Sequence, residues 1–253
     1  MRNWSLKDSA ELYQTANWGA GFFGINEKGH VQVTPRGPEG PAVDLFELLP
    51  SLQARGLRLP LLVRFSDIVS SRVRGLAKSF AKAIGDYSYG GRFRGVYPIK
   101  VNQQRHVVEE IVRYGAPHRI GLEAGSKPEL VIALALLDTP GALLICNGYK
   151  DRSYIETALL AQRIGRTPII VIDRFQELEL AIRISRELGV RPHLGVRARL
   201  TTKSAGKWAD SSGERAKFGL SAAEIVEAVD QLRAEKMLDC LELLHFHIGS
   251  QIT

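Results

Sequence analysis

From Gly95 onward, short runs rich in β-branched and aliphatic residues alternate with segments of helical periodicity such as Val107–Val112. The six runs are Val96–Asn102, Ile120–Ala124, Leu143–Asn147, Ile169–Asp173, His193–Arg199 and Leu243–Ile248. Strands that alternate with helices pair in parallel through right-handed crossovers. No glycine-rich dinucleotide fingerprint follows the first run, which favours a (β/α)8 TIM barrel over a Rossmann sheet. Six units are two short of eight, so we expect an α/β barrel truncated after about six strands.

Residues 1–59 have a different pattern. Aromatic and aliphatic residues at 22–25 precede a turn at 26–29, and apolar and polar residues then alternate over 31–33. A stretch rich in proline and glycine follows, which indicates a β-hairpin and its exit. We therefore expect two parts: an N-terminal β segment over residues 1–59, belonging to a β-domain, and a partial barrel over residues 60–253.

The charge is positive but spread along the chain. Lys and Arg total 34 against 27 Asp and Glu, a net charge of +7, with no blocks of like charge. This indicates an ordinary basic surface or a fragment whose acidic remainder is missing, and it disfavours nucleic-acid and membrane partners. Cys146 and Cys240 have no partner at metal-ligand spacing, Met1–Asp8 lacks a signal-peptide core, and no apolar run is long enough to span a membrane. We expect a cytoplasmic location.

Polar residues interrupt the apolar runs near their carboxyl ends. Because side chains alternate across a strand, one face collects Lys100 and Asn102 from the first run, Glu123 from the second, Arg197 from the fifth, and His245 and His247 from the sixth. Barrel active sites are assembled at the carboxyl ends of the strands. We therefore expect these side chains to face one site in the barrel mouth, with Ile99 and Val101 packed under the helices.

Lys100 is a lysine in an otherwise apolar run. Desolvation there would lower its pKa and make the neutral amine available as a nucleophile, as a Schiff-base lysine holding pyridoxal phosphate requires. The alternative is a lysine that reaches solvent from a strand end. Pro98 is a further warning, because proline fits poorly in a central strand.

His247 has two interpretations. Beside the small Gly249, its ring could stack on a flat cofactor while Ser250 donates to a phosphate. It could instead be a core histidine satisfied by a backbone carbonyl. His245 and His247 resemble a metal pair, but no third ligand is evident nearby, so we expect no metal centre here.

Arg197 could bind an anionic cofactor oxygen, or could form an ion pair with Glu123 or Asp173. Glu123 could be that partner or could influence Lys100. The segment Thr201–Lys217, rich in Ser, Gly, Lys and Asp, is long for a simple connection. It is either an active-site flap or a solvated surface loop.

Several of these stretches resemble the biosynthetic arginine decarboxylases. The specific ones are Val96-Tyr-Pro-Ile-Lys100-Val-Asn-Gln103, Ile145-Cys-Asn-Gly-Tyr-Lys-Asp151, His245-Phe-His-Ile-Gly-Ser-Gln251 and the opening Trp18…Gly21-Phe-Phe-Gly-Ile-Asn26…Gly29. Looser motifs, Glu123-Ala-Gly-Ser-Lys127 and Lys217-Phe-Gly219, are shared with the ornithine and diaminopimelate decarboxylases. The resemblance implies a pyridoxal-phosphate-binding barrel of the alanine racemase and ornithine decarboxylase type.

The resemblance also implies roles for individual residues. Lys100 would form the imine with pyridoxal phosphate, and His247 would stack on the pyridine ring; these two are the expected catalytic residues. Ser250 would contact the phosphate, and Arg197 would lie near the phenolic oxygen. Glu123 completes the expected cofactor-binding set.

The implied reaction is decarboxylation of L-arginine to agmatine and carbon dioxide, an early step toward polyamines. The family's magnesium requirement and its homo-oligomers with shared active sites are implied as well. The family's phosphate loop and C-terminal β-domain would lie beyond Thr253, so we expect the chain alone to be inactive. The alternatives are a decarboxylase of ornithine or diaminopimelate, a non-catalytic relative that binds the cofactor, and a disfavoured nucleic-acid-binding module.

Overall fold

The computed structural model describes residues 3–200 and 218–249 of the 253-residue chain. Its contacts divide the chain into two compact units, residues 1–83 and residues 84–253. The boundary after residue 59 stays a prediction. No helix in the described part of the chain is long and apolar enough to cross a membrane.

The N-terminal unit combines a small antiparallel sheet with short helices. The predicted hairpin is confirmed, because β1 and β2 pair antiparallel with Phe23 opposite Val33, and β3 pairs with the other side of β2. The elements in chain order are α1 (Leu6–Leu12), α2 (Thr15–Trp18), β1 (Phe23–Ile25), β2 (Val31–Val33), β3 (Val43–Asp44), α3 (Leu45–Ala54) and α4 (Ser66–Asp86), the last of which reaches past residue 83.

The sequence pattern did not predict the helix α3. Asp44 begins it, with a carboxylate that accepts hydrogen bonds from the backbone N–H groups of Phe46 and Glu47. Pro50 lies inside this helix. Because proline removes a backbone donor and usually ends a helix, its presence argued against a helix in the sequence. Residues 1–59 are therefore a mixed α and β segment rather than a purely β segment.

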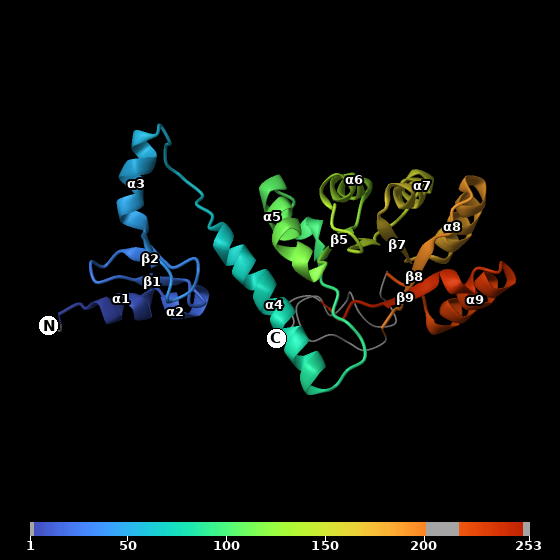
Figure 1. The fold of residues 1–253 in the computed structure, drawn as a ribbon, viewed down its shortest axis with the longest axis horizontal. Coiled ribbons are helices and arrows are strands. Elements are labelled where there is room, and N and C mark those ends of the chain that lie inside the picture. Colours follow the sequence, from blue (N-terminus) through green and yellow to red (C-terminus); the bar gives the residue numbers. More distant parts are fainter. Residues whose placement is uncertain (1–2, 201–217, 250–253) are drawn as a thin grey trace. The chain divides into compact units, whose positions relative to one another are not determined.

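The second unit is a six-stranded parallel sheet, in the order β4-β5-β6-β7-β8-β9. The strands are β4 (Val96–Pro98), β5 (Gly121–Ala124), β6 (Leu143–Cys146), β7 (Thr167–Ile172), β8 (His193–Arg197) and β9 (Leu241–His245). The helices are α5 (Arg105–Gly115), α6 (Lys127–Leu136), α7 (Arg152–Ala161), α8 (Phe175–Leu188) and α9 (Ala222–Ala234). They follow one another in an arc along the outer face of the sheet (Figure 1). This one-sided cover confirms the prediction of barrel-type rather than doubly wound packing.

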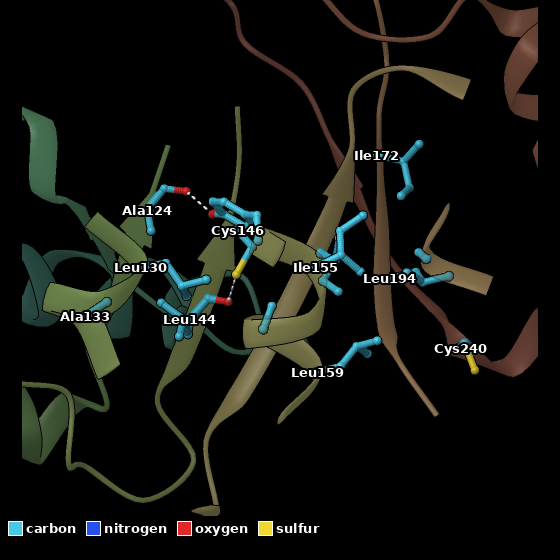
Figure 2. Packing of buried hydrophobic residues seen from close by; sticks show 14 of the residues in the cluster. Ala124, Leu130, Ala133, Leu144, Cys146, Ile155, Leu159, Ile172, Leu194 and Cys240 are labelled. Carbon is cyan, nitrogen blue, oxygen red and sulfur yellow. Dashed lines mark hydrogen bonds between the residues drawn. The ribbon is translucent and has the colours of Figure 1, made fainter. Parts of the chain in front are cut away.

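The main hydrophobic core lies between this sheet and its helices. Leu144 and Cys146 of β6 and Ile172 of β7 belong to one fully buried cluster with Ile155 and Leu159 of α7 (Figure 2). Burial of each such aliphatic side chain stabilises the fold by about 1.5–3 kcal/mol. The alternating residues of the same strands point to the inner face, where the described structure holds a much smaller apolar cluster of Ile145, Ile169 and Val171.

The first and the last strand of this sheet both end earlier than predicted. The first stops at Pro98 and continues as a 3-10 turn over Ile99–Val101, since proline cannot extend the hydrogen-bonded ladder. The prediction for Val101 was wrong: its side chain is exposed, whereas Ile99 is fully buried as predicted. The last strand ends at His245, so His247 lies in the segment beyond it.

Two helices begin with the same contact. At the start of α6, the Glu129 carboxylate accepts a hydrogen bond from the backbone N–H of Gly125 at 2.6 Å. At the start of α8, the Glu177 carboxylate accepts one from the backbone N–H of Asp173 at 3.0 Å. In each case an acidic residue in the first helical turn reaches back to the first residue after the strand. Each strand is thereby tied to the helix that follows it.

Candidate functional site

The inner face of the six-stranded sheet lines a cavity of about 980 Å³. Each of the six strands, or the residue that directly follows it, contributes to the lining of this cavity. The polar and charged residues around it are Arg92, Arg94, Lys100, Glu123, Glu129, Asn147, Asp173, Arg197, His245 and His247. The predicted site residues that the structure describes, Lys100, Glu123, Arg197 and His247, are thus brought to one cavity.

Lys100 and Glu123 meet at this cavity. The Lys100 Nζ atom lies 3.5 Å from Oε1 of Glu123, whose side chain is only 8% exposed. The same carboxylate oxygen accepts a hydrogen bond from Nδ2 of Asn147 at 3.4 Å. Glu123 therefore holds an amide on one side and the lysine amine on the other, which fixes where the amine can lie.

Of the two alternatives that the sequence left open for Lys100, exposure to solvent is the one observed, since its side chain is 64% exposed. The residue sits in the 3-10 turn after Pro98 and not within a continuous strand. The Tyr97 hydroxyl donates to the Asn102 carbonyl oxygen at 3.2 Å, a contact that spans this turn. Lys100 is therefore presented at the cavity mouth by a short turn, where a carbonyl compound can approach the amine.

Arg197 is held from two sides. Its guanidinium NH1 lies 3.6 Å from Oδ2 of the buried Asp173, so of the two ion-pair partners considered from the sequence, Asp173 is the one observed. The other oxygen of Asp173 accepts a hydrogen bond from the backbone N–H of Gly219 at 2.5 Å. The ring of Phe218 lies 5.2 Å below the guanidinium. This cation is therefore oriented in advance toward the cavity, where it could bind an anionic oxygen.

His245 is the partly buried histidine of the site. Burial, together with repulsion from the nearby Arg197, lowers the pKa of its imidazole to about 4. Its buried Nδ1 atom has no hydrogen-bond partner among the described residues. A neutral imidazole with a free nitrogen is available to a bound group.

We expect this histidine to make the fold less stable as the pH falls. The pKa of the imidazole is 6.5 in its ordinary state and about 4 in the folded chain, so between these values the unfolded chain binds more protons. The free energy of unfolding should therefore fall from pH 6.5 to pH 4, with a His245 contribution on the order of 1–2 kcal/mol. Urea unfolding at low protein concentration should show that the free energy of unfolding depends less steeply on pH in His245→Asn than in the wild type. The exposed His106 provides the matched control: equal slopes for His245→Asn and His106→Asn would contradict the expectation.

His247 lies at the cavity but outside the strand, with an exposed side chain. The backbone N–H of Gly249 donates to its Nδ1 atom at 3.0 Å. In the neutral ring the proton is then carried by Nε2. The histidine is thus not a satisfied core residue, and its ring can present a face or an N–H to a ligand. Ser250, the predicted phosphate contact, lies outside the described residues, as does Thr201–Lys217.

Some residues at the cavity were not assigned a role from the sequence. Asn147 is the first residue after β6 and follows the same inward alternation as Ile145, which was the available signal. Its Oδ1 atom is buried and has no hydrogen-bond partner among the described residues. Arg92 and Arg94 also line the cavity, but they precede the first strand, where no periodic pattern identified them.

One group of possible metal ligands occurs in the described part of the chain, and it is in the N-terminal unit. It consists of His30, Asp44 and Glu47. Asp44 already accepts backbone hydrogen bonds and lies 2.9 Å from the His30 ring nitrogen, while Glu47 pairs with Lys28. Magnesium prefers free oxygen ligands around an octahedron. These residues do not fit that ion.

The cavity does fit a pyridoxal group. Lys100 supplies an amine at its mouth, and Arg197 supplies a fixed cation. Asn147 and His245 line the same cavity, and each has a buried polar atom, Oδ1 and Nδ1, without a hydrogen-bond partner in the part of the chain that the structure describes. A flat aromatic aldehyde with an anionic substituent would satisfy this combination of an amine, a cation and free polar atoms.

Comparison with known proteins agrees with this assignment. The family model described as pyridoxal-dependent decarboxylase, pyridoxal binding domain, matches residues 70–253. Over 253 residues the chain is 60% identical to the biosynthetic arginine decarboxylase of Gloeobacter violaceus, covering all of this chain and 39% of that protein. The corresponding enzyme of a Nostoc species is 58% identical over 252 residues, of which the chain covers 37%. The chain thus spans less than two fifths of the length of these curated relatives.

Solved structures show the same fold. The biosynthetic arginine decarboxylase of Campylobacter jejuni superposes with a TM-score of 0.83 at 35% identity, covering 95% of this chain and 38% of that chain. A diaminopimelate decarboxylase from M. jannaschi superposes with a TM-score of 0.69 at 21% identity, covering 93% and 50%. This second likeness shows the fold alone. The predicted fold class, a decarboxylase-type α/β barrel present in part, is confirmed. The chain belongs to the pyridoxal-dependent decarboxylases, and its residues 70–253 belong to their pyridoxal-binding domain.

Proposed function

We propose that the protein containing this chain decarboxylates L-arginine to agmatine and carbon dioxide with pyridoxal phosphate. The observation that supports it is the cavity at which Lys100, Glu123, Arg197 and His247 converge. Identities of 58–60% to proteins named biosynthetic arginine decarboxylase favour arginine over other amino acids. Since those relatives are much longer, the activity is assigned to the whole protein.

Lys100 is the residue proposed to hold the cofactor. Its Nζ atom is at the cavity mouth, and Glu123 keeps it there as an ion pair at 3.5 Å. Transfer of a proton from Nζ to the Glu123 carboxylate would leave the neutral amine, the form that attacks an aldehyde. When bound, the cofactor supplies an electron sink for the pair of electrons released with carbon dioxide.

The remaining residues are proposed to position the cofactor and shield it. Arg197, fixed by Asp173 and Phe218, would neutralise the phenolic oxygen. His247 would stack on the ring, and its Nε2 proton is available to an anionic neighbour. Ser250 would donate to the phosphate; this assignment is carried by resemblance alone.

The substrate is tested by comparing amino acids on the complete protein. We expect faster carbon dioxide release from arginine than from ornithine, lysine or diaminopimelate at matched concentration. A clear preference for one of the other three would move the protein to a related decarboxylase. Cofactor binding without release from any of the four would support the non-catalytic alternative, which the presence of Lys100 and His247 at one cavity disfavours.

Three further properties are proposed by resemblance or chemistry. The complete protein is a homo-oligomer with shared active sites, and it requires Mg²⁺ bound by residues other than His30, Asp44 and Glu47. It works in the cytoplasm, which the free and buried thiols of Cys146 and Cys240 favour.

A further inference from the structure

A buried ion pair lies behind the cavity wall without touching the cavity. The side chains of Lys150 and Glu177 are 0% and 2% exposed, and Lys150 Nζ lies 3.1 Å from Glu177 Oε2. Neither residue lines the cavity around Lys100. Two charges lose their hydration on burial, and a well-packed apolar pair of similar size is often as stable or more stable. Stability alone therefore does not account for the pair.

The hydrogen bonds of this pair join two strand ends. The Glu177 carboxylate accepts the backbone N–H of Lys150 through Oε1 and the backbone N–H of Asp173 through Oε2, both at 3.0 Å. Lys150 Nζ also donates to the carbonyl oxygen of Gly148 at 2.6 Å. The segment after β6 and the first residue after β7 are thus fixed to one carboxylate.

The segment after β6 leads to Lys100. Asn147 is the first residue of that segment, and its amide donates to Glu123, the partner of Lys100. Gly148 follows with a φ of +73°, and a Cβ atom there would lie 2.1 Å from the Gly125 carbonyl oxygen. This backbone is therefore tightly confined, and Lys150 holds it through the Gly148 carbonyl.

The residue after β7 leads to Arg197. Glu177 holds the backbone of Asp173, and the Asp173 side chain holds both Arg197 and the backbone N–H of Gly219. Rotation or displacement of Asp173 would release the guanidinium from its present direction.

We propose that the Lys150–Glu177 ion pair is the positioning device of this site. It sets Asn147, and through it Glu123 and Lys100, and it sets Asp173, and through it Arg197. The proposal rests on the proposed function, because the proposed function assigns the cofactor to this cavity. It requires no particular amino-acid substrate.

The test uses the complete protein and replaces the pair as a unit. One double variant is apolar, Lys150→Met with Glu177→Leu, and one is neutral and polar, Lys150→Gln with Glu177→Gln. The matched control is Arg152→Met with Glu187→Gln, an exposed ion pair between α7 and α8 that starts two residues after Lys150. Thermal unfolding, the affinity for pyridoxal phosphate, its absorbance spectrum when bound and turnover of arginine are measured for each.

We expect both double variants to fold and to bind the cofactor on the order of tenfold to a hundredfold more weakly, with an altered absorbance spectrum and reduced turnover. The control should match the wild type. Asn147→Ala should weaken cofactor binding by itself but add little in either double variant, because the pair acts through Asn147. If the pair were purely structural, the losses of cofactor affinity caused by Asn147→Ala and by either double variant would add.

Wild-type affinity, spectrum and turnover in either folded double variant would overturn the proposal. Failure of both double variants to fold would also overturn it, because the pair would then be required by the fold itself. Cofactor affinity and absorbance are measured without any amino acid. A wild type that binds pyridoxal phosphate but does not decarboxylate arginine would therefore refute the proposed substrate and leave the positioning test intact.

Discussion

Lys100→Ala in the complete protein is expected to lower the turnover of arginine by at least about a hundredfold, because the residue supplies both the attachment point and a proton-transferring amine. Borohydride reduction of the wild type with pyridoxal phosphate, followed by peptide mapping, should find the cofactor on Lys100. The position of its Nζ at the cavity mouth beside Glu123 is the physical reason.

The control for this variant is Lys78→Ala, which removes an exposed lysine of α4 and should leave turnover unchanged. Label on a different lysine, with Lys100 unmodified, would show that the assignment is wrong. Loss of turnover with unchanged covalent labelling would instead place Lys100 outside the attachment site.

The second large effect concerns the chain alone. Residues 1–253, purified without the rest of the protein, are expected to show no decarboxylation of arginine. Within the described residues, β4 and β9 each have one side without a partner strand. Leu244, Phe246 and Ile248, on the outward side at the end of the sheet, are 62%, 53% and 58% exposed. Open strand edges and exposed apolar rows promote association.

The energy involved is large enough to matter. If an adjoining βα unit covers about 400 Å² of apolar surface, its absence costs on the order of 10 kcal/mol at about 25 cal/mol per Å². This is comparable to the net stability of a typical domain, roughly 5–15 kcal/mol. Size-exclusion chromatography and carbon dioxide release check the expectation. A monodisperse preparation that unfolds cooperatively and decarboxylates arginine would show that these 253 residues suffice.

The central strands could be predicted from the sequence because they are buried on both faces. Ile169–Ile172 reads as a continuous apolar run, and residues 170 and 172 face the helices while 169 and 171 face inward, as alternation requires. The same rule placed Glu123 and Arg197 on the inner face, where both line the cavity. Periodicity fixes these positions independently of distant parts of the chain.

Contacts between distant residues could not be predicted in this way. Lys150 and Glu177 are 27 residues apart, and in the sequence each resembles an ordinary surface charge. Their burial depends on how the segment after β6 packs against the first turn of α8. The exposure of Lys100 could be given only as one of two alternatives, although its local cause is visible in the sequence: Pro98 ends the strand two residues before it.

The acidic contacts at the starts of α6 and α8 bear on how this architecture can accept new sequence. Each spans a connection of only two residues, 125–126 and 173–174, and an insertion there would pull the carboxylate away from the backbone N–H that it serves. Between β8 and α9, by contrast, the chain has residues 198–221, and α9 begins with its own capping box at Ser221 and Glu224. The cap of this helix is made within its own first turn, and the contacts of Arg197 and Arg199 with Leu220 bring the two ends of this connection together, so added residues between them need break neither. Length variation among related enzymes should therefore concentrate after β8 and be rare after β5 and β7. Diversity of substrate would then be acquired in the connection between β8 and α9.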